Sequence, residues 1–179
     1  MKKILYVLVV IAIILASSAS LTGCDSYIDA IARSYSMPDP SAAPAIHNQP
    51  LNFRNYEGLT DAQREKLQSM LNGLGSTVRG ELHYNVIAAE YADGGGLRVF
   101  VFIRNGTGRI LQEARLNPAT VTLSDGRIVA SANFNSMNIG PLLPSETVIW
   151  LLLFPSDTVL IRDADLSGVE LLYITEYRW

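Results

Sequence analysis

Hydrophobic residues recur along this chain with two different periods. A short region with helical spacing, near residues 60–74, comes first, and a longer region with a period of two follows it. At Thr60 the residues TDAQ fit a capping box, in which the Thr60 and Gln63 side chains satisfy the free amides of a helix start. Apolar residues then recur at spacings of three and four, at Leu67, Met70, Leu71 and Leu74. Gly73 and Gly75 supply a stop signal. The pattern predicts one short amphipathic helix near residues 60–72, with one face to bury.

Beyond residue 80 the period changes to two, which is the period of a β-strand. Apolar residues alternate over 82–88, DGGG at 93–96 provides a turn, and the alternation resumes over 97–103, so a hairpin is predicted. A second hairpin turn is predicted at Ser124-Asp125-Gly126. Further runs lie near residues 109–115, 119–123, 127–134, 146–154 and 169–177. About seven short strands with regular turns predict a mainly β protein, an immunoglobulin-like antiparallel β-sandwich preceded by the helix.

Two of the predicted strands, 97–104 and 147–154, are apolar on both faces. Such a strand belongs inside a sheet whose outer face is also covered, and the helix is the expected cover, because monomers rarely expose large apolar patches. The alternative is a docking patch, whose partner or ligand contacts would be Arg98, Phe100, Phe102 and Arg104. The two arginines would then clamp an anion or a carboxylate, or else simply reach solvent from the strand ends.

The N-terminal leader has the order of a secretory signal. Lys2 and Lys3 precede an uncharged apolar run from Ile4 to Ala16, and small residues follow. The strongly apolar part is shorter than the roughly 20 residues of a membrane-spanning helix. The next four residues, Leu21, Thr22, Gly23 and Cys24, resemble the bacterial lipobox. The resemblance implies that residues 1–23 are a lipoprotein signal peptide and that a diacylglyceryl group is attached to Cys24. The expected location is the cell membrane, lipid-anchored on its extracytoplasmic face.

Composition separates a tether from a domain. Residues 24–50 contain four of the eight prolines among small and polar residues, which predicts a lipidated N-terminus followed by an extended tether. Residues 51–179 then form the helix and sandwich domain. Loss of residues 1–23 removes two of the 14 basic residues and none of the 17 acidic ones, leaving a formal charge of −5. That charge argues against a nucleic-acid partner.

The candidate chemical sites are weak. Asp163, Asp165, Ser167 and Gly168 imitate the start of a calcium loop, but its twelfth position, which needs a glutamate, is Ile174. His47 and His83 have no second ligand at zinc spacing. The Asn105-Gly106-Thr107 sequon is better interpreted as a turn. We therefore predict no catalytic residue, metal ligand or cofactor. An enzyme would require titratable groups from distant segments to meet in one cleft.

Several segments together resemble the SLAP domain over about residues 59–154. They are LTDAQREKLQSMLNGL, GELHYNVIAAEY, LRVFVFIRN, VTLSDGRIVASANF and IGPLLPSETVIWLLLF. The most specific parts are VFIRN and the P-x(5)-W-x(3)-F pattern of Pro144, Trp150 and Phe154. The resemblance implies an envelope protein of Gram-positive bacteria linked to S-layer assembly and an accessory secretion system.

The expected function is therefore a membrane-anchored, non-catalytic module for protein interaction or envelope assembly, with other envelope or secreted proteins as partners. The alternative is a lipoprotein that binds a small ligand or a glycan. It would need a concave pocket lined by aromatic residues such as Tyr84, Tyr91 or Tyr173.

Overall fold

The computed structural model describes residues 49–54, 56 and 58–179. The predicted signal peptide, the lipobox with Cys24, most of the tether and His47 lie outside the described residues. Within the described part the elements are β1 (Leu51–Asn52), α3 (Asp61–Gly73), β2 (Leu82–Tyr91), β3 (Leu97–Asn105), β4 (Leu111–Thr122), β5 (Ile128–Leu142), β6 (Thr147–Phe154), the short 3₁₀ helix η2 (Ser156–Thr158) and β7 (Glu170–Arg178). No helix there combines the length and the hydropathy of a membrane span.

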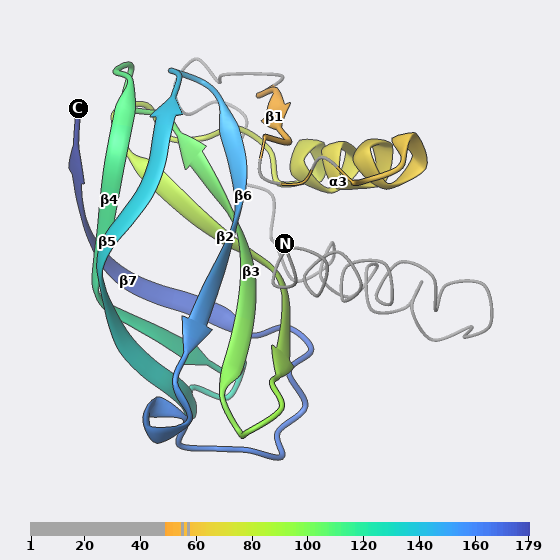
Figure 1. Cartoon of the computed structure of the whole chain (residues 1–179), viewed down its shortest axis with the longest axis vertical. Helices are drawn as coiled ribbons and strands as arrows, with labels where there is room; N and C mark the ends of the chain where they lie inside the picture. The colour runs from red at the N-terminus through yellow and green to blue at the C-terminus, as the bar shows by residue number, and fades with distance from the viewer. Residues whose placement is uncertain (1–48, 55, 57) are drawn as a thin grey trace.

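The strands form two sheets, one of four strands in the order β1-β6-β3-β2 and one of three in the order β5-β4-β7. Neighbouring strands are antiparallel, except that β1 runs parallel to β6. The sheets face one another, and α3 lies outside the four-stranded sheet, on the side away from β4, β5 and β7 (Figure 1). The predicted mainly β sandwich with one short helix is confirmed. It shares the sandwich architecture of immunoglobulin-like domains, with a strand order of its own.

The main core fills the space between the two sheets. Alternate residues of β3, namely Val99, Val101 and Ile103, point inward and are completely buried. They meet inward residues of β4 such as Leu116 and Val121. Because successive side chains of a strand point to opposite faces, the even-numbered residues of β3 must lie on the outer face of the sheet.

The helix α3 covers part of that outer face. Its N-cap is Thr60, and the predicted capping box with Gln63 is present. Leu67 and Leu71 are the buried residues of the helix. They belong to a second apolar cluster with Leu51, Tyr56, Leu59, Phe100, Phe102 and Ile149. Helix coverage of the doubly apolar strands, the interpretation favoured from the sequence, is therefore what the structure shows.

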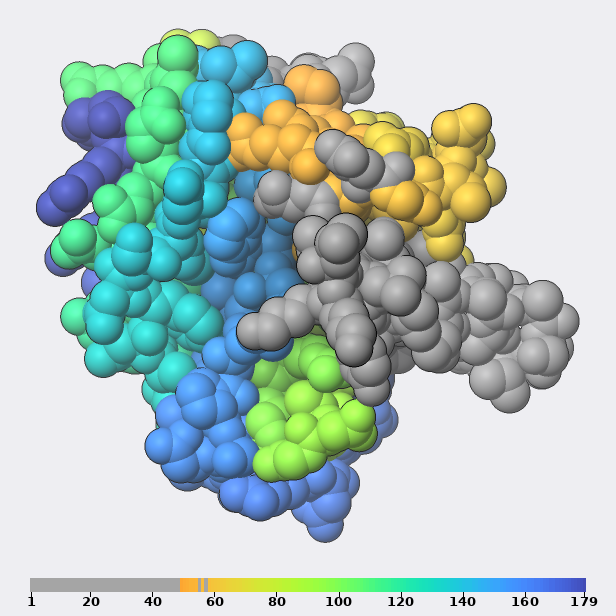
Figure 2. All heavy atoms as spheres, viewed as in Figure 1, coloured from red at the N-terminus to blue at the C-terminus, as the bar shows by residue number. Residues whose placement is uncertain are grey.

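Two strands differ from the sequence prediction. The runs predicted at 109–115 and 119–123 are one strand, β4, which passes through Asn117 and Pro118 as a bulge where the register with both neighbouring strands shifts. Proline is tolerated inside a sheet at such a bulge because the local ladder hydrogen bonds are already interrupted. The strand β1 was not predicted, since two residues are too few to show a period. In Figure 2, β1 (orange) lies against β5 and β6 at one end of the sandwich.

Candidate functional site

The point where the N-terminal segment enters the domain is a buried polar cluster, which we call the Gln49 junction. It consists of Gln49, Thr77, Arg104 and Thr147, all buried. The Gln49 amide nitrogen donates to Thr77 Oγ1 (2.7 Å), while its Oε1 accepts from Arg104 Nε (3.0 Å) and from Thr147 Oγ1 (3.1 Å). The carbonyl oxygen of Pro50 accepts from the Thr147 amide (3.0 Å). Residues 49 and 50, assigned to the tether from composition, thus make specific contacts with the sandwich.

Arg104 does not reach solvent. Its side chain is only 4% exposed, and its recorded hydrogen bonds go to uncharged oxygens of Gln49, Asn85 and Gly75. Burial lowers the pKa of Arg104 to about 10, because the charged form loses its hydration. The alternative in which Arg104 reaches solvent from the strand end is wrong, because the turn after α3 and Gln49 close over the end of β3.

Arg98 lies six residues from Arg104 on the same strand, which corresponds to roughly 20 Å. One clamp formed by both arginines is therefore ruled out by geometry. Arg98 Nη1 instead lies 3.0 Å from Oε1 of Glu90 on the neighbouring strand β2. The pair is partly exposed, so it contributes little to stability.

The two phenylalanines named as possible partner contacts are buried beneath the helix. Phe100 is 3% exposed and Phe102 is 1% exposed, and both belong to the cluster with Leu67 and Leu71. In this arrangement their rings offer no surface to a partner. A partner could contact these rings only if α3 moved away from the outer face of the sheet.

Asn105, the last residue of VFIRN, joins two loops at one end of the sandwich, β3–β4 and β5–β6. Its side chain is completely buried, and its Nδ2 donates to the carbonyl oxygens of Arg109 (2.8 Å), Leu142 (3.0 Å) and Leu143 (3.0 Å). Its Oδ1 accepts from the amide and the hydroxyl of Thr107. The turn interpretation of the sequon agrees with this geometry, since the amide nitrogen that a glycan would need is used internally.

The second family-specific pattern also builds this end of the sandwich. Glu146, two residues after Pro144, accepts a hydrogen bond from Asn52 Nδ2 (2.7 Å) and one from the Leu143 amide (2.8 Å). The first bond ties β1 to the β5–β6 hairpin across 94 residues of sequence. The N-terminal segment is therefore held by Arg104 of VFIRN, through Gln49, and by Glu146, which lies between Pro144 and Trp150, through Asn52.

The tyrosines considered for a ligand pocket are engaged in packing. The rings of Tyr84 and Tyr173 meet edge to face at 4.7 Å, and the Tyr84 amide donates to the Tyr173 hydroxyl (3.3 Å). Burial raises the pKa of both hydroxyls. The Tyr91 hydroxyl donates to the Ile161 carbonyl (3.0 Å) and so holds the loop after β6.

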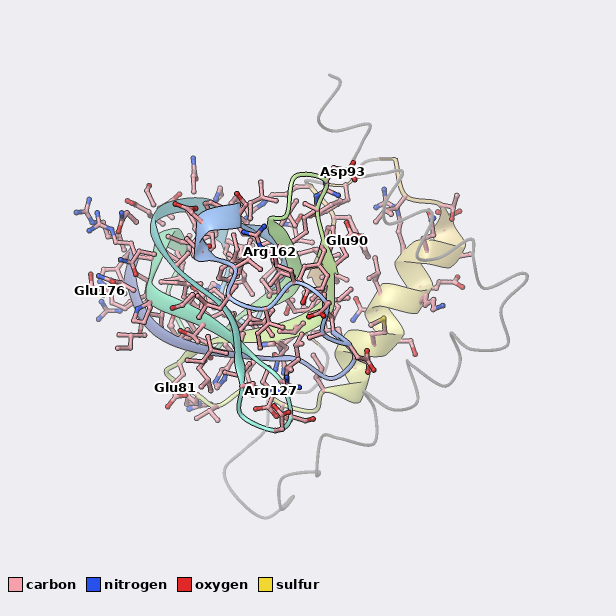
Figure 3. All side chains as sticks on the ribbon, turned by 90° about the horizontal axis from the view of Figure 1, so that it is seen from below. Glu81, Glu90, Asp93, Arg127, Arg162 and Glu176 are labelled. Atoms are coloured by element: carbon pink, nitrogen blue, oxygen red, sulfur yellow. The ribbon has the colours of Figure 1, made fainter. Side chains whose placement is uncertain are left out.

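Several acidic side chains lie far apart over the domain. Glu81, Glu90 and Glu176 lie on different sides of it (Figure 3). Within the described ranges no group of three or more His, Cys, Asp or Glu side chains is placed to hold a metal ion. Asp165 of the calcium-like segment accepts a hydrogen bond from the Ser167 amide (2.9 Å), which closes a polar turn. This bond lowers the pKa of Asp165.

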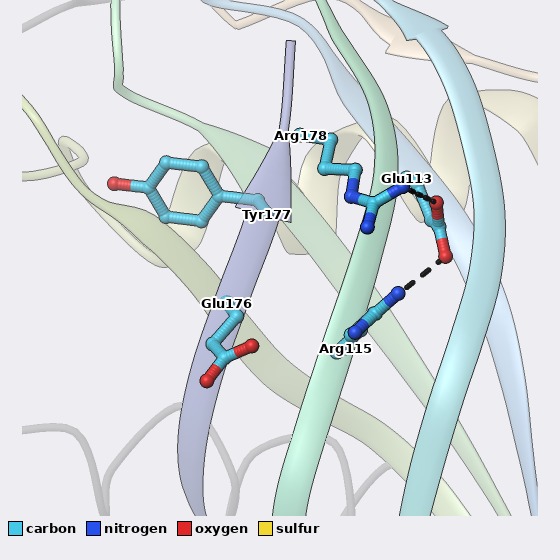
Figure 4. Close-up of a pocket in the computed structure, with 5 residues that line it drawn as sticks. All are labelled: Glu113, Arg115, Glu176, Tyr177 and Arg178. Carbon is cyan, nitrogen blue, oxygen red and sulfur yellow. Dashed lines mark ion pairs between the residues drawn. The ribbon is translucent and has the colours of Figure 1, made fainter.

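A shallow surface pocket of about 170 Å³ lies on the outer face of the three-stranded sheet (Figure 4). Glu113 lies between two arginines there, with Oε1 3.7 Å from Arg115 Nε and Oε2 3.9 Å from Arg178 Nη1. A hydrogen bond from Ser136, followed by these two cations, lowers the pKa of Glu113. The ring of Tyr177 points away from the charged group. The pocket is smaller than the roughly 300 Å³ at which small-molecule sites begin.

One surface feature was missed from the sequence, the open edge of the three-stranded sheet. The strand β7 is last in the order β5-β4-β7, and its outward residues Leu172 and Ile174 are 57% and 64% exposed. Both faces of this strand carry apolar residues, and that signal was available in residues 170–178. From this pattern the sequence predicts a strand but not its place at the edge of a sheet.

A comparison with protein families agrees with this architecture. Residues 51–174, more than half of the chain, match the family model described as the SLAP domain. The match begins at the first residue of β1 and ends inside β7, so it covers both sheets and the helix. No curated protein and no solved structure matches the chain significantly. The family match identifies this chain as a member of the SLAP domain family.

Proposed function

We propose that this chain is a membrane-anchored extracytoplasmic lipoprotein whose SLAP domain acts as a non-catalytic module for protein interaction or envelope assembly. A diacylglyceryl group on Cys24 would hold the chain at the membrane. Residues 25–48 would form the tether, and the domain would meet other envelope or secreted proteins beyond it.

One observation carries this proposal, the order of the segments along the chain. The family match begins at residue 51. The lipobox-like LTGC and the proline-rich stretch both precede that point. A cysteine placed 25 residues before the junction suits an anchor, because a chain of that length spans roughly 30 Å as a coil.

The structure also supports the choice of an interaction module. Two residues in the segments that resemble the family, Arg104 and Glu146, bond to the N-terminal segment at Gln49 and Asn52. These bonds fix the orientation in which the tether presents the sandwich. A presented surface, such as a sheet edge or the loops at one end, is where interaction domains bind.

Two measurements test the proposal in a Gram-positive host that expresses the full chain. The first is metabolic labelling with a radioactive fatty acid, followed by separation of the membrane from the medium. We expect a labelled membrane form from the parent chain and an unlabelled form from Cys24→Ala. A parent chain that carries no label would overturn the lipoprotein part.

The second measurement is capture of the tagged chain from gently crosslinked, detergent-solubilised membranes, with Cys24→Ala as the unanchored control. The interaction part predicts a reproducible envelope or secreted protein that depends on the anchor. Equal recovery from both forms, or none from either, counts against it. Labelling and capture fail independently, so the two parts of the proposal are judged separately.

A further inference from the structure

The open edge of β7 has a sequence that is complementary to itself. The outward face of the strand carries Glu170, Leu172, Ile174, Glu176 and Arg178 in order. These five residues are exposed, while Leu171 on the opposite face is buried in the core. Glu170 lies at one end and Arg178 at the other, Leu172 and Ile174 lie between them, and Glu176 precedes Arg178.

We propose that β7 pairs antiparallel with β7 of a second copy of this chain, with Ile174 facing Ile174 on the two-fold axis. The two three-stranded sheets would then join into one six-stranded sheet. This inference goes beyond the proposed function, because it requires neither the lipid anchor nor another envelope protein. It concerns only residues on the edge of the described domain.

The edge is built to accept a strand. The strand β7 is nine residues long. The register shift between β4 and β7 comes from an extra residue in β4, at Asn117 and Pro118, so β7 itself contains no bulge. Natural edge strands are usually protected by charged side chains, lysine above all, by proline, by a bulge or by short length. Residues 170–178 contain neither lysine nor proline, and their charged residues, Glu170, Glu176 and Arg178, lie toward the ends of the strand. An edge of this kind is a template for pairing with another strand.

Charge selects the register. With Ile174 opposite Ile174, Glu170 lies opposite Arg178 of the second copy, and the two-fold axis repeats this pair, so both ends carry opposite charges. A shift of the centre by one residue toward the N-terminus would place Glu170 opposite Glu176. A shift by two residues toward the C-terminus would place Glu176 opposite itself. Directly opposed like charges destabilise strand pairs, whereas opposite charges and aliphatic pairs stabilise them.

Arg178 is available for this pairing. Its side chain is 70% exposed, and its intrachain neighbour Glu113 lies 3.9 Å away, near the limit of an ion pair. On the aliphatic part of the edge, Leu172 would face Glu176, beside the central isoleucine pair. A single pair of nine-residue strands buries less than the roughly 1,200 Å² of a standard interface. We therefore expect a weak dimer, which a covalent trap will detect best.

The experiment is disulfide trapping with the full chain, in membranes of the expression host and after purification in mild detergent. The test variant is Ile174→Cys. Opposed Cβ atoms in an antiparallel pair lie about 4.5–5.5 Å apart, close enough for a disulfide after a small adjustment. The matched control is Leu153→Cys, because Leu153 is also an exposed aliphatic residue on an outer sheet face (56%). Both are made with Cys24 intact and with Cys24→Ala.

Under mild oxidation we expect Ile174→Cys to form a species of twice the chain mass at least tenfold more than Leu153→Cys, with or without Cys24. Equal yields from the two variants would overturn the proposal. So would a crosslinked species of a different mass, which would mean that a strand of another protein occupies the edge. Since the Cys24→Ala form is scored separately, failure of the lipid anchor does not imitate failure of the dimer.

Charge exchange then tests the register. In the Ile174→Cys background, Glu170→Arg and Arg178→Glu each place like charges opposite one another twice and are expected to lower the dimer yield about tenfold. The combined change Glu170→Arg with Arg178→Glu restores both pairs and should recover the yield to within about twofold. Single changes without effect, or a double change that fails to recover, would overturn this register.

Discussion

Arg104 Nε donates a hydrogen bond of 3.0 Å to Oε1 of Gln49, a residue 55 positions earlier in the chain, and both side chains are buried. A buried guanidinium whose recorded acceptors are all uncharged is costly unless its hydrogen bonds are kept. The Gln49 side chain also donates a hydrogen bond to Thr77 and accepts one from Thr147. It is therefore the residue on which the whole junction depends.

Gln49→Ala is expected to lower the free energy of unfolding by about 2–3 kcal/mol, because it leaves buried polar atoms of Arg104, Thr77 and Thr147 without this partner. Urea denaturation followed by circular dichroism measures the change. Asn135→Ala is the control, since Asn135 is exposed on β5, and its effect should stay within about 0.5 kcal/mol. Equal effects of the two variants would show that the junction does not contribute to stability.

Leu71→Ala tests the cover over the outer sheet face. Leu71 is almost completely buried against the cluster of Phe100 and Phe102, so its truncation should cost about 3 kcal/mol. Binding of a dye for exposed apolar surface should increase as the helix loosens. Glu65→Ala, an exposed change on the same helix, should alter neither stability nor dye binding. If both variants behave alike, α3 does not pack as described.

Two glycine substitutions should have opposite signs. A Cβ atom on Gly106 would lie 2.4 Å from the Val78 carbonyl oxygen and 2.9 Å from that of Glu81, so the backbone must move. We expect Gly106→Ala to destabilise the domain by about 2–3 kcal/mol. A Cβ atom added to Gly73, the last residue of α3, would have no heavy atom within 4 Å. Gly73→Ala should therefore stabilise by up to about 1 kcal/mol, through helix propensity. Thermal melts of the two variants would decide, and a rise for Gly106→Ala would contradict the turn geometry.

His83 should make stability depend on pH in the weakly acidic range. Its buried Nε2 has no hydrogen-bond partner in the described structure, although Glu81 Oε2 lies 3.4 Å away. Burial lowers the pKa of His83; Glu81 opposes this shift, and Arg104 adds to it. The unfolded chain takes up the proton at the ordinary pKa of about 6.5, before the folded chain does. Protonation therefore favours unfolding, and stability is lost as the pH falls below about 6.5.

Urea midpoints measured between pH 7.5 and 5 check this prediction. The midpoint of the parent chain should fall across that range, and His83→Gln should flatten the curve. His47→Gln is the control for the other histidine. The carboxyl groups of Glu113, Asp125 and Asp165, whose pKa values are lowered, add a further loss only below about pH 4.5. A midpoint that is flat in the parent chain above pH 5 would contradict the prediction.

Local patterns predicted the elements that are held by local contacts. The capping box at Thr60 and the hairpin turns at 93–96 and 124–126 depend on neighbouring residues, and each is present. The doubly apolar strands were also recognised correctly as central, because burial on both faces leaves a continuous apolar run. The helix was the natural element to cover them, as no other amphipathic helix was predicted.

Contacts between distant residues explain what the sequence did not predict. Arg104 was interpreted either as a ligand contact or as a strand-end residue reaching solvent, yet its burial depends on Gln49 and Gly75, which lie far from it in sequence. The bulge at Pro118 lets one strand continue where a break was expected, because the neighbouring strands adjust their register. The open edge of β7 becomes visible only when the strand order is known. The lipid on Cys24 stays a prediction.

The pairing of β1 with β6 has a consequence for the order of folding. The two strands are separated by nearly the whole domain, since Leu51 pairs with Thr147. During synthesis the N-terminal segment emerges first, but its partner strand β6 is made only after most of the domain. Until β6 is present, β1 and α3 have no complete sheet to pack against, and the outer face of β3, with Phe100 and Phe102, stays exposed. Docking of β1 and α3 therefore has to wait for β6, and the apolar outer face of β3 is open to aggregation through much of synthesis.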